Sequence, residues 1–593
     1  MGKKIATVLV MGGALMACWY CSKSPTDSVN CTPISEPVVV LDYGSFRGRR
    51  SHLHHDIERF FGIPYAEPPV GDRRFTNPIP PLRNYGEHDA RKHAPVCPQQ
   101  SLGGDTVSKY KDWFNNLNLN PLEFFKPFGS GQEDCLTLDI ARPAGLNENS
   151  KLPVMYFIYP GGFNYGASWQ LSPVPMVKKS IDMGLPVIWV SANHRMNAFG
   201  FLGGREVGEA GVGNLGLKDQ RLSMEWIQKH ISKFGGDPEK VMIYGESCRS
   251  RSLDSKEGLI NNLSILWNIQ FLAGAISISH HLLAYNGNLN GLFRAAICQS
   301  GTALPAGKLS EGAGQKGFDF LVDKVGCKDS KDRLDCLRHA DLKKLQDAIN
   351  DLPGTFSFGA FPFTFGPSVD GEFITESMQL ALAAGRFAKI PLISTNMKDE
   401  GTVLTISSSS IKTEDQLRET LQQKVPKASP EMIEKILQLW PSDPKLGSPF
   451  GTGDKNAVTP VYKQYSAILG DLAFQGLRRL FLRTTANVMP SWSLLDRAEE
   501  NFPIIGAFHA SDLPAVIGII PGKRTDDYQA RWISFAYNLD PNYEGLPRWE
   551  KYNNRQSLVM TKDGSIGMEP DNFREEEIEY YLQNLDKINF VSP

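Results

Sequence analysis

The residues most suggestive of chemistry are Gly245-Glu246-Ser247, which directly follow the apolar run VMIY at 241–244. In a nucleophile elbow, G-x-S-x-G, the serine lies on a tight turn between a strand and a helix, so its hydroxyl faces the substrate. Small flanking residues let the helix pass close to the strand, and the helix N-terminus offers backbone N–H groups. The tripeptide alone is a weak signal, because a serine that ends a strand is usually structural. It predicts a nucleophile only if suitable elements and partners occur elsewhere.

Two other patterns resemble known sites but lack the context that such sites need. Residues 211–216 (GVGNLG) match the dinucleotide-binding pattern G-x-G-x-x-G, yet no strand precedes them. His52, His54 and His55 lie in a polar stretch between two apolar runs, and no second group of Cys or His follows at metal-ligand spacing. We interpret these histidines as part of a solvated hairpin loop. The sequence therefore predicts neither a metal nor a cofactor.

Predicted strands and predicted helices, which could position a nucleophile, alternate along the chain. Amphipathic stretches such as 215–234 and 376–384 predict helices between short apolar runs that predict strands. The predicted strands are 153–160, 186–193, 241–247, 294–300, 390–396 and 503–509. Strands separated by helices form βαβ units, which predict an α/β fold with a mostly parallel sheet and helices on both faces. No repeat or linker interrupts the pattern, so we expect one catalytic domain over residues 22–593.

Composition excludes several functional classes. Hydrophobic residues make up 41% of the 593 residues and charged residues 22%, which is typical of a globular protein and excludes a largely disordered chain. Lys and Arg total 63 against 65 Asp and Glu, a net charge of −2. Without an excess of basic residues, nucleic-acid binding is not expected.

The first residues predict export from the cell. Lys3 and Lys4 precede an uncharged, largely apolar stretch from Ile5 to Cys21, and polar residues follow. This pattern is typical of a signal peptide, here residues 1–21, and it predicts a secreted, extracellular protein. A membrane anchor is the alternative, but the most apolar part is shorter than the roughly 20 residues that span a bilayer.

Disulfides are expected in an exported protein, because the secretory pathway is oxidising. We expect the pairs Cys97–Cys135 and Cys327–Cys336, whose members lie in loop-like sequence, and we expect Cys298 to be a buried, inert thiol. The triplets Asn30-Cys-Thr and Asn262-Leu-Ser match the glycosylation acceptor pattern.

Many segments, in the right order, resemble the type-B carboxylesterase/lipase family, which includes fungal secreted lipases, sterol esterases and cholinesterases. They span most of the chain between about residues 37 and 555, and the resemblance implies an α/β-hydrolase fold. The segments include FFGIPYAEPPVGDRRF (60–75), EDCLTLDIARP (133–143), LPVMYFIYPGGF (152–163), VSANHRMNAFGFL (190–202), GNLGLKDQRLSMEWIQKHISKFGGDPEKV (213–241), FRAAICQSG (293–301), GPSVDGEFI (366–374), STNMKDEGT (394–402), GAFHASDLP (506–514) and WISFAYNLDPN (532–542).

The resemblance implies a catalytic triad of Ser247 as nucleophile, His509 as general base and Glu400 as the carboxylate that orients His509. The order Ser, acid, His along the chain is the one expected for this fold. Asp399 is the rival carboxylate, but the family motif places the catalytic acid directly before Gly-Thr, which favours Glu400.

An oxyanion hole is implied by the same resemblance, with donors matching the backbone N–H groups of Gly161, Gly162 and the residue after the nucleophile. The family has three glycines before Phe163, whereas this chain has Pro160 in place of the first. Proline fixes φ and could shift this loop, although both donor glycines are present.

A departure from the family follows Ser247 immediately. The family continues A-G-A-x-S, but here residues 248–272 intervene before the pattern resumes at Ala273, which would supply the third oxyanion donor. In the chain as written that donor would be Cys248, and the expected helix would be displaced. Three interpretations compete: an inserted loop, a diverged non-catalytic protein, or an unspliced intron that keeps the reading frame. We favour the intron, because the elbow tolerates little variation while both flanks stay family-like.

Substrate class is less defined than reaction class. The loop 98–134, between the cysteines of the first predicted disulfide, contains WFNNLNLNPLEFFKPF (113–128) and resembles the lid of the fungal lipase and sterol-esterase branch, although a packed surface loop is the alternative. A lid would bring transient contact with a lipid interface. Choline esters are disfavoured, because no aromatic placement suits a cation site. We expect a secreted serine hydrolase of small-molecule or lipid carboxylic esters that needs no cofactor; the alternative is a catalytically impaired, cholinesterase-like binding or adhesion protein.

Overall fold

Apolar segments of the sequence assemble into one large and one small sheet in the computed structural model, which describes residues 36–101, 131–246, 273–303, 305–354 and 364–588. The span Pro37–Pro593 is one compact unit. Across the large sheet the strands are β14 (Gly564–Pro570), β13 (Gln556–Thr561), β12 (Ser491–Asp496), β11 (Leu392–Met397), β10 (Ala295–Gln299), β9 (Gly236–Glu246), β7 (Leu152–Ile158), β8 (Ile188–Ala192), β6 (Thr137–Pro143), β4 (Ile57–Pro64) and β3 (Arg49–Arg50). The small sheet contains β1 (Val38–Leu41), β2 (Gly44–Arg47) and β5 (Glu87–Asp89).

Most of the large sheet is parallel. All neighbouring strands from β8 to β13 pair in parallel, and antiparallel pairs add β6, β4 and β3 at one edge and β14 at the other. The central strands β8, β10 and β11 are buried along their whole length, as expected for strands covered on both faces.

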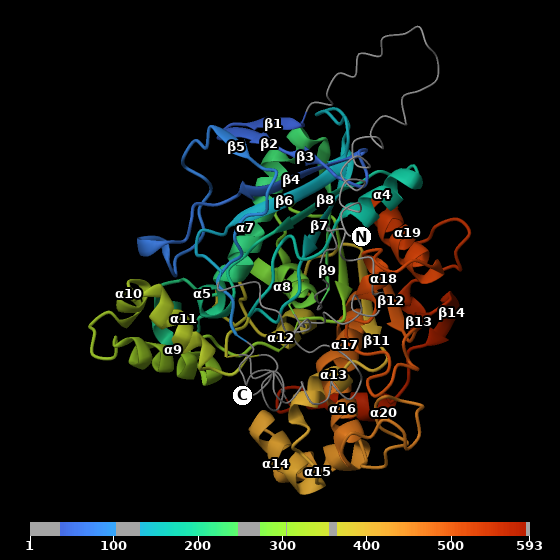
Figure 1. Cartoon of the computed structure of the whole chain (residues 1–593). Coiled ribbons are helices and arrows are strands. Elements are labelled where there is room, and N and C mark those ends of the chain that lie inside the picture. The colour runs from blue at the N-terminus through green and yellow to red at the C-terminus, as the bar shows by residue number, and fades with distance from the viewer. Residues whose placement is uncertain (1–35, 102–130, 247–272, 304, 355–363, 589–593) are drawn as a thin grey trace, which may run out of the picture. The chain divides into compact units, whose positions relative to one another are not determined.

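Helices cover both sides of this sheet (Figure 1). α4 and α19 pack on each other and on the sheet, whereas α8 packs on β7, β9 and β10, and α17 packs on β11 and β12. The helices are α4 (Val174–Asp182), α5 (Asn197–Phe201), α6 (Arg205–Glu209), α7 (Leu215–His230), α8 (Gly274–Gly287), α9 (Gly312–Val325), α10 (Arg333–Arg338), α11 (Leu342–Asn350), α12 (Met378–Ala383), α13 (Thr402–Thr405), α14 (Glu414–Lys424), α15 (Pro430–Leu439), α16 (Tyr462–Gly470), α17 (Gly476–Thr485), α18 (Leu513–Val516), α19 (Lys523–Asn538) and α20 (Glu575–Gln583). The predicted α/β class, a mostly parallel sheet with helices on both faces, is confirmed.

One predicted strand is wrong. Residues 503–509 form turns rather than a strand, and the last parallel strand before β13 is β12, which the sequence prediction missed. Pro503 has no N–H to donate to a sheet, and Ile504 and Gly506 have positive φ of 71° and 59°. The segment meets the strand region only through a single bridge between Phe508 and Asp399.

Some predicted features lie outside the described residues. These are the signal peptide (1–21), both glycosylation triplets, most of the loop 98–134, Ser247 and the intervening segment 248–272. Among the helices of the described ranges, none is long and apolar enough to cross a membrane.

Candidate active site

The end of β9 and the start of α8 are in direct backbone contact. A Cβ placed on Gly274 would lie 2.3 Å from the carbonyl oxygen of Ile158 and 2.6 Å from that of Glu246. A Cβ on Gly245 would lie 2.8 Å from the same Ile158 oxygen and 2.9 Å from the carbonyl carbon of Gly274. Glycine is therefore required on both sides of the turn. This is the close strand–helix approach that a nucleophile elbow needs, although Ser247 itself lies outside the described residues.

His509 and Glu400 form a buried pair. Nδ1 of His509 forms a hydrogen bond with Oε2 of Glu400. The other carboxylate oxygen, Oε1, accepts hydrogen bonds from the backbone N–H of Met397 (2.7 Å) and from the side-chain amide of Asn396 (2.9 Å). These bonds hold the carboxylate in one orientation, and the ring of Phe474 packs 4.7 Å from the imidazole, centroid to centroid. A carboxylate on Nδ1 leaves Nε2 as the nitrogen that can exchange a proton with a nucleophile.

Close backbone packing explains why glycine and threonine follow Glu400. A Cβ on Gly401 would lie 2.0 Å from the carbonyl oxygen of Ser466 in α16, so the chain can pass only as glycine. The hydroxyl of Thr402 shares its single proton between the carbonyl oxygens of Asp399 (2.9 Å) and Ile505 (2.7 Å). The motif thus joins the turn that carries Glu400 to the segment that leads to His509.

The carboxylate of Asp399 is hydrogen-bonded to Ser448 and to nearby backbone N–H groups rather than to His509. Its carboxylate accepts hydrogen bonds from the hydroxyl of Ser448 (3.0 Å), the N–H of Phe450 (2.9 Å) and the N–H of Ala507 (3.0 Å). Burial raises the pKa of this carboxyl from 3.8 to about 6. The structure therefore places Glu400 on His509 and uses Asp399 to tie the 448–450 segment to the segment before His509.

The glycine loop after β7 lies beside the elbow. β7 pairs with β9 in parallel and Ile158 is opposite Gly245, so the loop of Gly161 and Gly162 begins next to the turn at Glu246. Both glycines have positive φ, 145° and 62°, and a Cβ on Gly161 would lie 1.6 Å from the carbonyl oxygen of Tyr165. The two residues after Pro160 thus adopt backbone conformations that glycine allows, although proline replaces the first glycine of the family motif.

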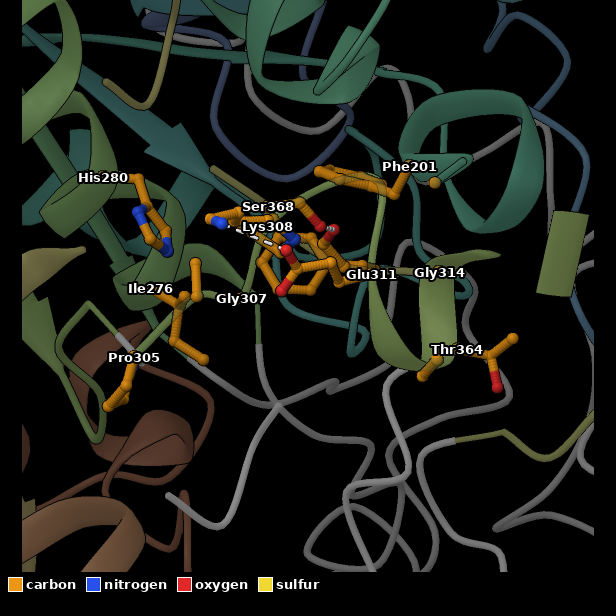
Figure 2. Close-up of a pocket in the computed structure, with 16 residues that line it drawn as sticks. Phe201, Ile276, His280, Pro305, Gly307, Lys308, Glu311, Gly314, Thr364 and Ser368 are labelled. Atoms are coloured by element: carbon orange, nitrogen blue, oxygen red, sulfur yellow. Dashed lines mark hydrogen bonds and ion pairs between the residues drawn. The ribbon is translucent and has the colours of Figure 1, made fainter. Parts of the chain in front are cut away.

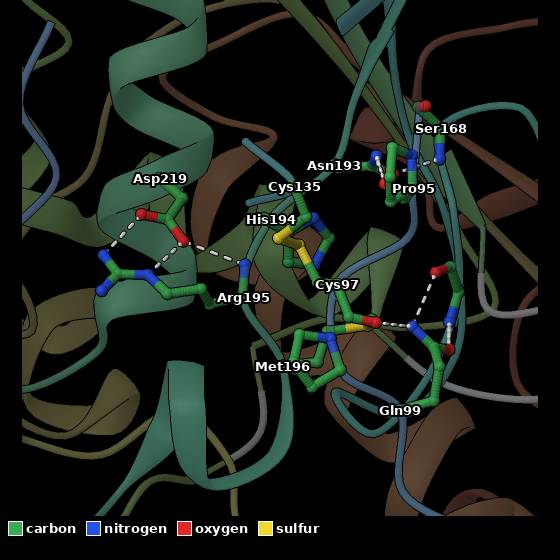
Figure 3. The surroundings of a disulfide bond; sticks show 12 residues. Pro95, Cys97, Gln99, Cys135, Ser168, Asn193, His194, Arg195, Met196 and Asp219 are labelled. Atoms are coloured by element: carbon green, nitrogen blue, oxygen red, sulfur yellow. Dashed lines mark hydrogen bonds and ion pairs between the residues drawn. A yellow bond between two sulfur atoms is a disulfide. The ribbon is translucent and has the colours of Figure 1, made fainter. Parts of the chain in front are cut away.

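The disulfide of Cys97 and Cys135 adjoins this loop through Gln99 (Figure 3). The side-chain amide of Gln99 donates to the carbonyl oxygens of Cys97 (2.6 Å) and Gly166 (3.2 Å), and its oxygen accepts the N–H of Gly166 (2.7 Å). The Cys97–Cys135 disulfide also joins the two ends of the loop 98–134. Cys327 and Cys336 form a second disulfide, and Cys298 is a buried thiol whose pKa burial raises to about 12.

Ala273 is the N-cap residue of α8 and the first described residue after position 246. The sequence prediction missed Asn396, whose side-chain amide donates a hydrogen bond to Glu400. A polar residue at the end of β11, four positions before Glu400, was the available signal for Asn396.

A parallel sheet with a Glu–His pair and a glycine elbow at the carboxyl ends of its strands defines an α/β-hydrolase. The model of the carboxylesterase family matches residues 35–255 and 272–580, and the chain belongs to that family. It is therefore a carboxylic ester hydrolase. The chain is 34% identical over 543 residues to the secreted triacylglycerol lipase LIP1 of Gibberella zeae, covering 89% of this chain and 87% of that protein.

A second lipase and a solved esterase structure are also similar to this chain. Lipase 4 of Diutina rugosa is 36% identical over 523 residues, covering 87% of this chain and 91% of the lipase. The solved structure of Aspergillus niger EstA has the same fold, with a TM-score of 0.74 at 24% identity, covering 94% of this chain and 99% of EstA. The family match omits residues 256–271, which lie within the intervening segment 248–272.

Proposed function

We propose that this protein is a secreted serine hydrolase that cleaves carboxylic esters through an acyl-enzyme. The observation that carries the proposal is the buried hydrogen bond between His509 and Glu400. The close approach of Gly274 in α8 to Glu246 at the end of β9 supports a tight turn after this strand. The alternative, a catalytically impaired binding or adhesion protein, has no need for an oriented Glu–His pair in this position.

In the first step Oγ of Ser247 attacks the ester carbonyl carbon, and the hydroxyl proton passes to Nε2 of His509. The carbonyl π electrons move to the oxygen, whose negative charge is stabilised by the N–H groups of Gly161 and Gly162 and, where Ala273 directly follows Ser247, by that of Ala273. The carbon–oxygen bond to the alcohol then breaks, and His509 gives its proton to the departing oxygen. Water repeats the sequence on the acyl-enzyme and releases the acid. The Glu400 carboxylate stabilises the imidazolium that forms on His509.

The substrates we propose are small-molecule or lipid esters. The names of the fungal relatives, a secreted triacylglycerol lipase among them, support the lipid class and an extracellular location. The signal peptide 1–21, followed by one catalytic domain over 22–593, belongs to the same proposal. So does a lid within 98–134 that contacts a lipid interface transiently, for which the Cys97–Cys135 disulfide supplies a closed loop.

For residues 248–272 we propose an unspliced intron. Two observations support this: the family match leaves out 256–271, and Gly274 touches Glu246 as it would if Ala273 followed Ser247 directly. The test is a chain that lacks residues 248–272, called the deleted form below. It should hydrolyse short p-nitrophenyl esters; a folded, secreted deleted form that turns over no ester would contradict the proposed function.

A further inference from the structure

The helix beside the catalytic pair contains a π-helical turn. α16 runs without a break into η5 (Asp471–Gln475) and then into α17; α16 packs on α13, and α17 packs on β11 and β12 (Figure 1). At η5 the N–H of Gly476 is hydrogen-bonded to the carbonyl oxygen of Asp471, five residues earlier instead of four. Single π-turns of this kind are rare within α-helices and are frequent at functional sites. All five residues of this π-turn are buried, so their contacts lie within the protein.

One side of this helix touches both members of the catalytic pair. A Cβ placed on Gly470, the last residue of α16, would lie 3.0 Å from the backbone nitrogen of Gly401 and 3.7 Å from Cβ of Glu400. One turn further on, the ring of Phe474 packs on the imidazole of His509. The helix therefore faces the Glu400 turn and the His509 ring within a few residues of each other.

The side chain of Gln475 reaches the end of the strand that precedes Glu400. Its amide donates a hydrogen bond to the carbonyl oxygen of Met397, the last residue of β11 (2.8 Å). The N–H of Met397 in turn donates to Oε1 of Glu400 (2.7 Å). A single residue, Met397, thus links the Gln475 amide to the catalytic carboxylate.

The oxygen of the Gln475 amide is held as well. It accepts a hydrogen bond from Nη2 of Arg478 in α17 (3.3 Å), and the Arg478 side chain is 1% exposed. Arg478 forms two hydrogen bonds of 2.8 Å to the carboxylate of Asp571, which directly follows β14. A fixed, charged donor selects one orientation of the amide, with its oxygen toward Arg478 and its nitrogen toward Met397. Rotating the amide would leave buried polar groups unpaired, which costs free energy.

The π-turn explains how Gln475 can reach β11. In an α-helix a residue five positions after Gly470 would lie about 140° further round the axis, well away from the side that touches Gly401. The wider π-turn takes in one extra residue and brings Gln475 back toward the side of Gly470. Phe474 and Gln475 can then both face the catalytic pair.

We propose that Gln475 is a positioning residue for the catalytic pair: through Met397 it fixes the direction in which the Glu400 carboxylate meets His509. This inference rests on the proposed function, which gives the pair its role. Orientation matters there, because a displacement of about 1 Å can cost on the order of a hundredfold in rate. Without the amide donor, the end of β11 and the N–H that holds Glu400 gain freedom.

Proton NMR of the full chain tests this without ester hydrolysis. The Nδ1 proton of His509 in its hydrogen bond to Glu400 should resonate far downfield, and loss of the signal in His509→Gln assigns it. Gln475→Met should move this resonance upfield and speed its exchange with water, because the carboxylate holds the proton less firmly. Gln475→Glu keeps an oxygen for Arg478 and loses the donor to Met397. It should have the same effect, even if loss of the Arg478 contact makes Gln475→Met fold poorly.

Gln464→Met is the matched control. Gln464 lies in α16, on the same continuous helix, is buried, and donates its side-chain amide to the carbonyl oxygen of Trp440 (2.7 Å). The substitution removes the same kind of hydrogen bond from a different partner, so the resonance should stay where it is. An unmoved resonance in both Gln475 variants, or an equal movement in Gln464→Met, would overturn the inference.

Kinetics of the deleted form give a second measurement. Gln475→Met should lower kcat about tenfold and leave KM within about twofold, because the Gln475 side chain is 1% exposed and touches no substrate. Gln464→Met should change neither constant by more than about twofold. A raised KM with unchanged kcat in Gln475→Met would contradict the positioning role. Failure of the deleted form to hydrolyse esters would overturn the proposed function instead, and would leave the comparison of resonances as it is.

Discussion

Gly274 at the start of α8 lies against Glu246 at the end of β9, close enough that any side chain on Gly274 would collide with the Glu246 carbonyl oxygen. The last described residue of β9 and the first residues of α8 therefore lie at one point of the fold. The turn through Ser247 to Ala273 can close there directly, as the elbow motif requires. This close approach supports the proposal that residues 248–272 are additional to the elbow.

Gly274→Ala should destabilise the protein severely. The new Cβ would meet the backbone oxygens of Ile158 and Glu246, and neither can move without shifting β7 or β9. We expect a loss of about 3 kcal/mol in the free energy of unfolding, the upper end for overpacking, measured by urea denaturation. Gly208→Ala in α6 is the control: its nearest contact is Leu309 Cδ2 at 3.5 Å, and stability should stay equal or rise slightly. Equal effects of both changes would contradict the close approach.

The two neighbouring carboxylates should differ in their effect on turnover. In the deleted form, Glu400→Gln should reduce kcat by about a thousandfold or more, because an amide on Nδ1 neither favours the right tautomer nor stabilises the imidazolium. Asp399→Asn should stay within about tenfold of the parent, because Asp399 bonds backbone and Ser448 rather than His509. Steady-state hydrolysis of p-nitrophenyl esters ranks them, and the reverse ranking would refute the assignment of Glu400.

Asp399 should also give stability a characteristic pH dependence. Its pKa is raised in the folded state, so the folded protein holds this proton more strongly than the unfolded chain between about pH 4 and pH 6. The stabilisation is complete below about pH 4 and is lost as pH rises through about 6.

Comparison with Asp399→Asn isolates this group, because the other titrations are shared; Lys398 and Lys463 are the charged neighbours that act on it. The free energy of unfolding of the parent minus that of the variant should fall by roughly 3 kcal/mol between pH 4 and pH 7. A difference that is flat or rises with pH would show that Asp399 titrates normally in the folded state.

Sequence patterns predicted most of the sheet because buried parallel strands are short, continuous apolar runs, as in β7, β8 and β10. The run 503–509 has the same composition and was predicted wrongly, since its turns depend on positive φ and on Asp399, which are tertiary features. Hydrogen bonds to Asp399 and from Thr402, which are distant in sequence, hold the segment before His509. No local sequence pattern encodes these hydrogen bonds.

The site could be predicted only through the family resemblance. Nothing local distinguishes Glu400 from Asp399; the difference lies in which carboxylate the chain turns toward His509. The pocket lined by Phe163, Phe201 and Ile276 (Figure 2) could not be predicted either, because it forms from segments far apart in the chain.

The most direct test compares the chain as written with the deleted form, under the same conditions and per folded molecule. Hydrolysis of a short p-nitrophenyl ester by the deleted form should exceed that of the chain as written by at least about a hundredfold, the effect of one lost oxyanion donor. Ser247→Ala in the deleted form should abolish almost all of that activity. Equal turnover by the two chains would contradict the account, because residues 248–272 would then be an accommodated loop within a working elbow.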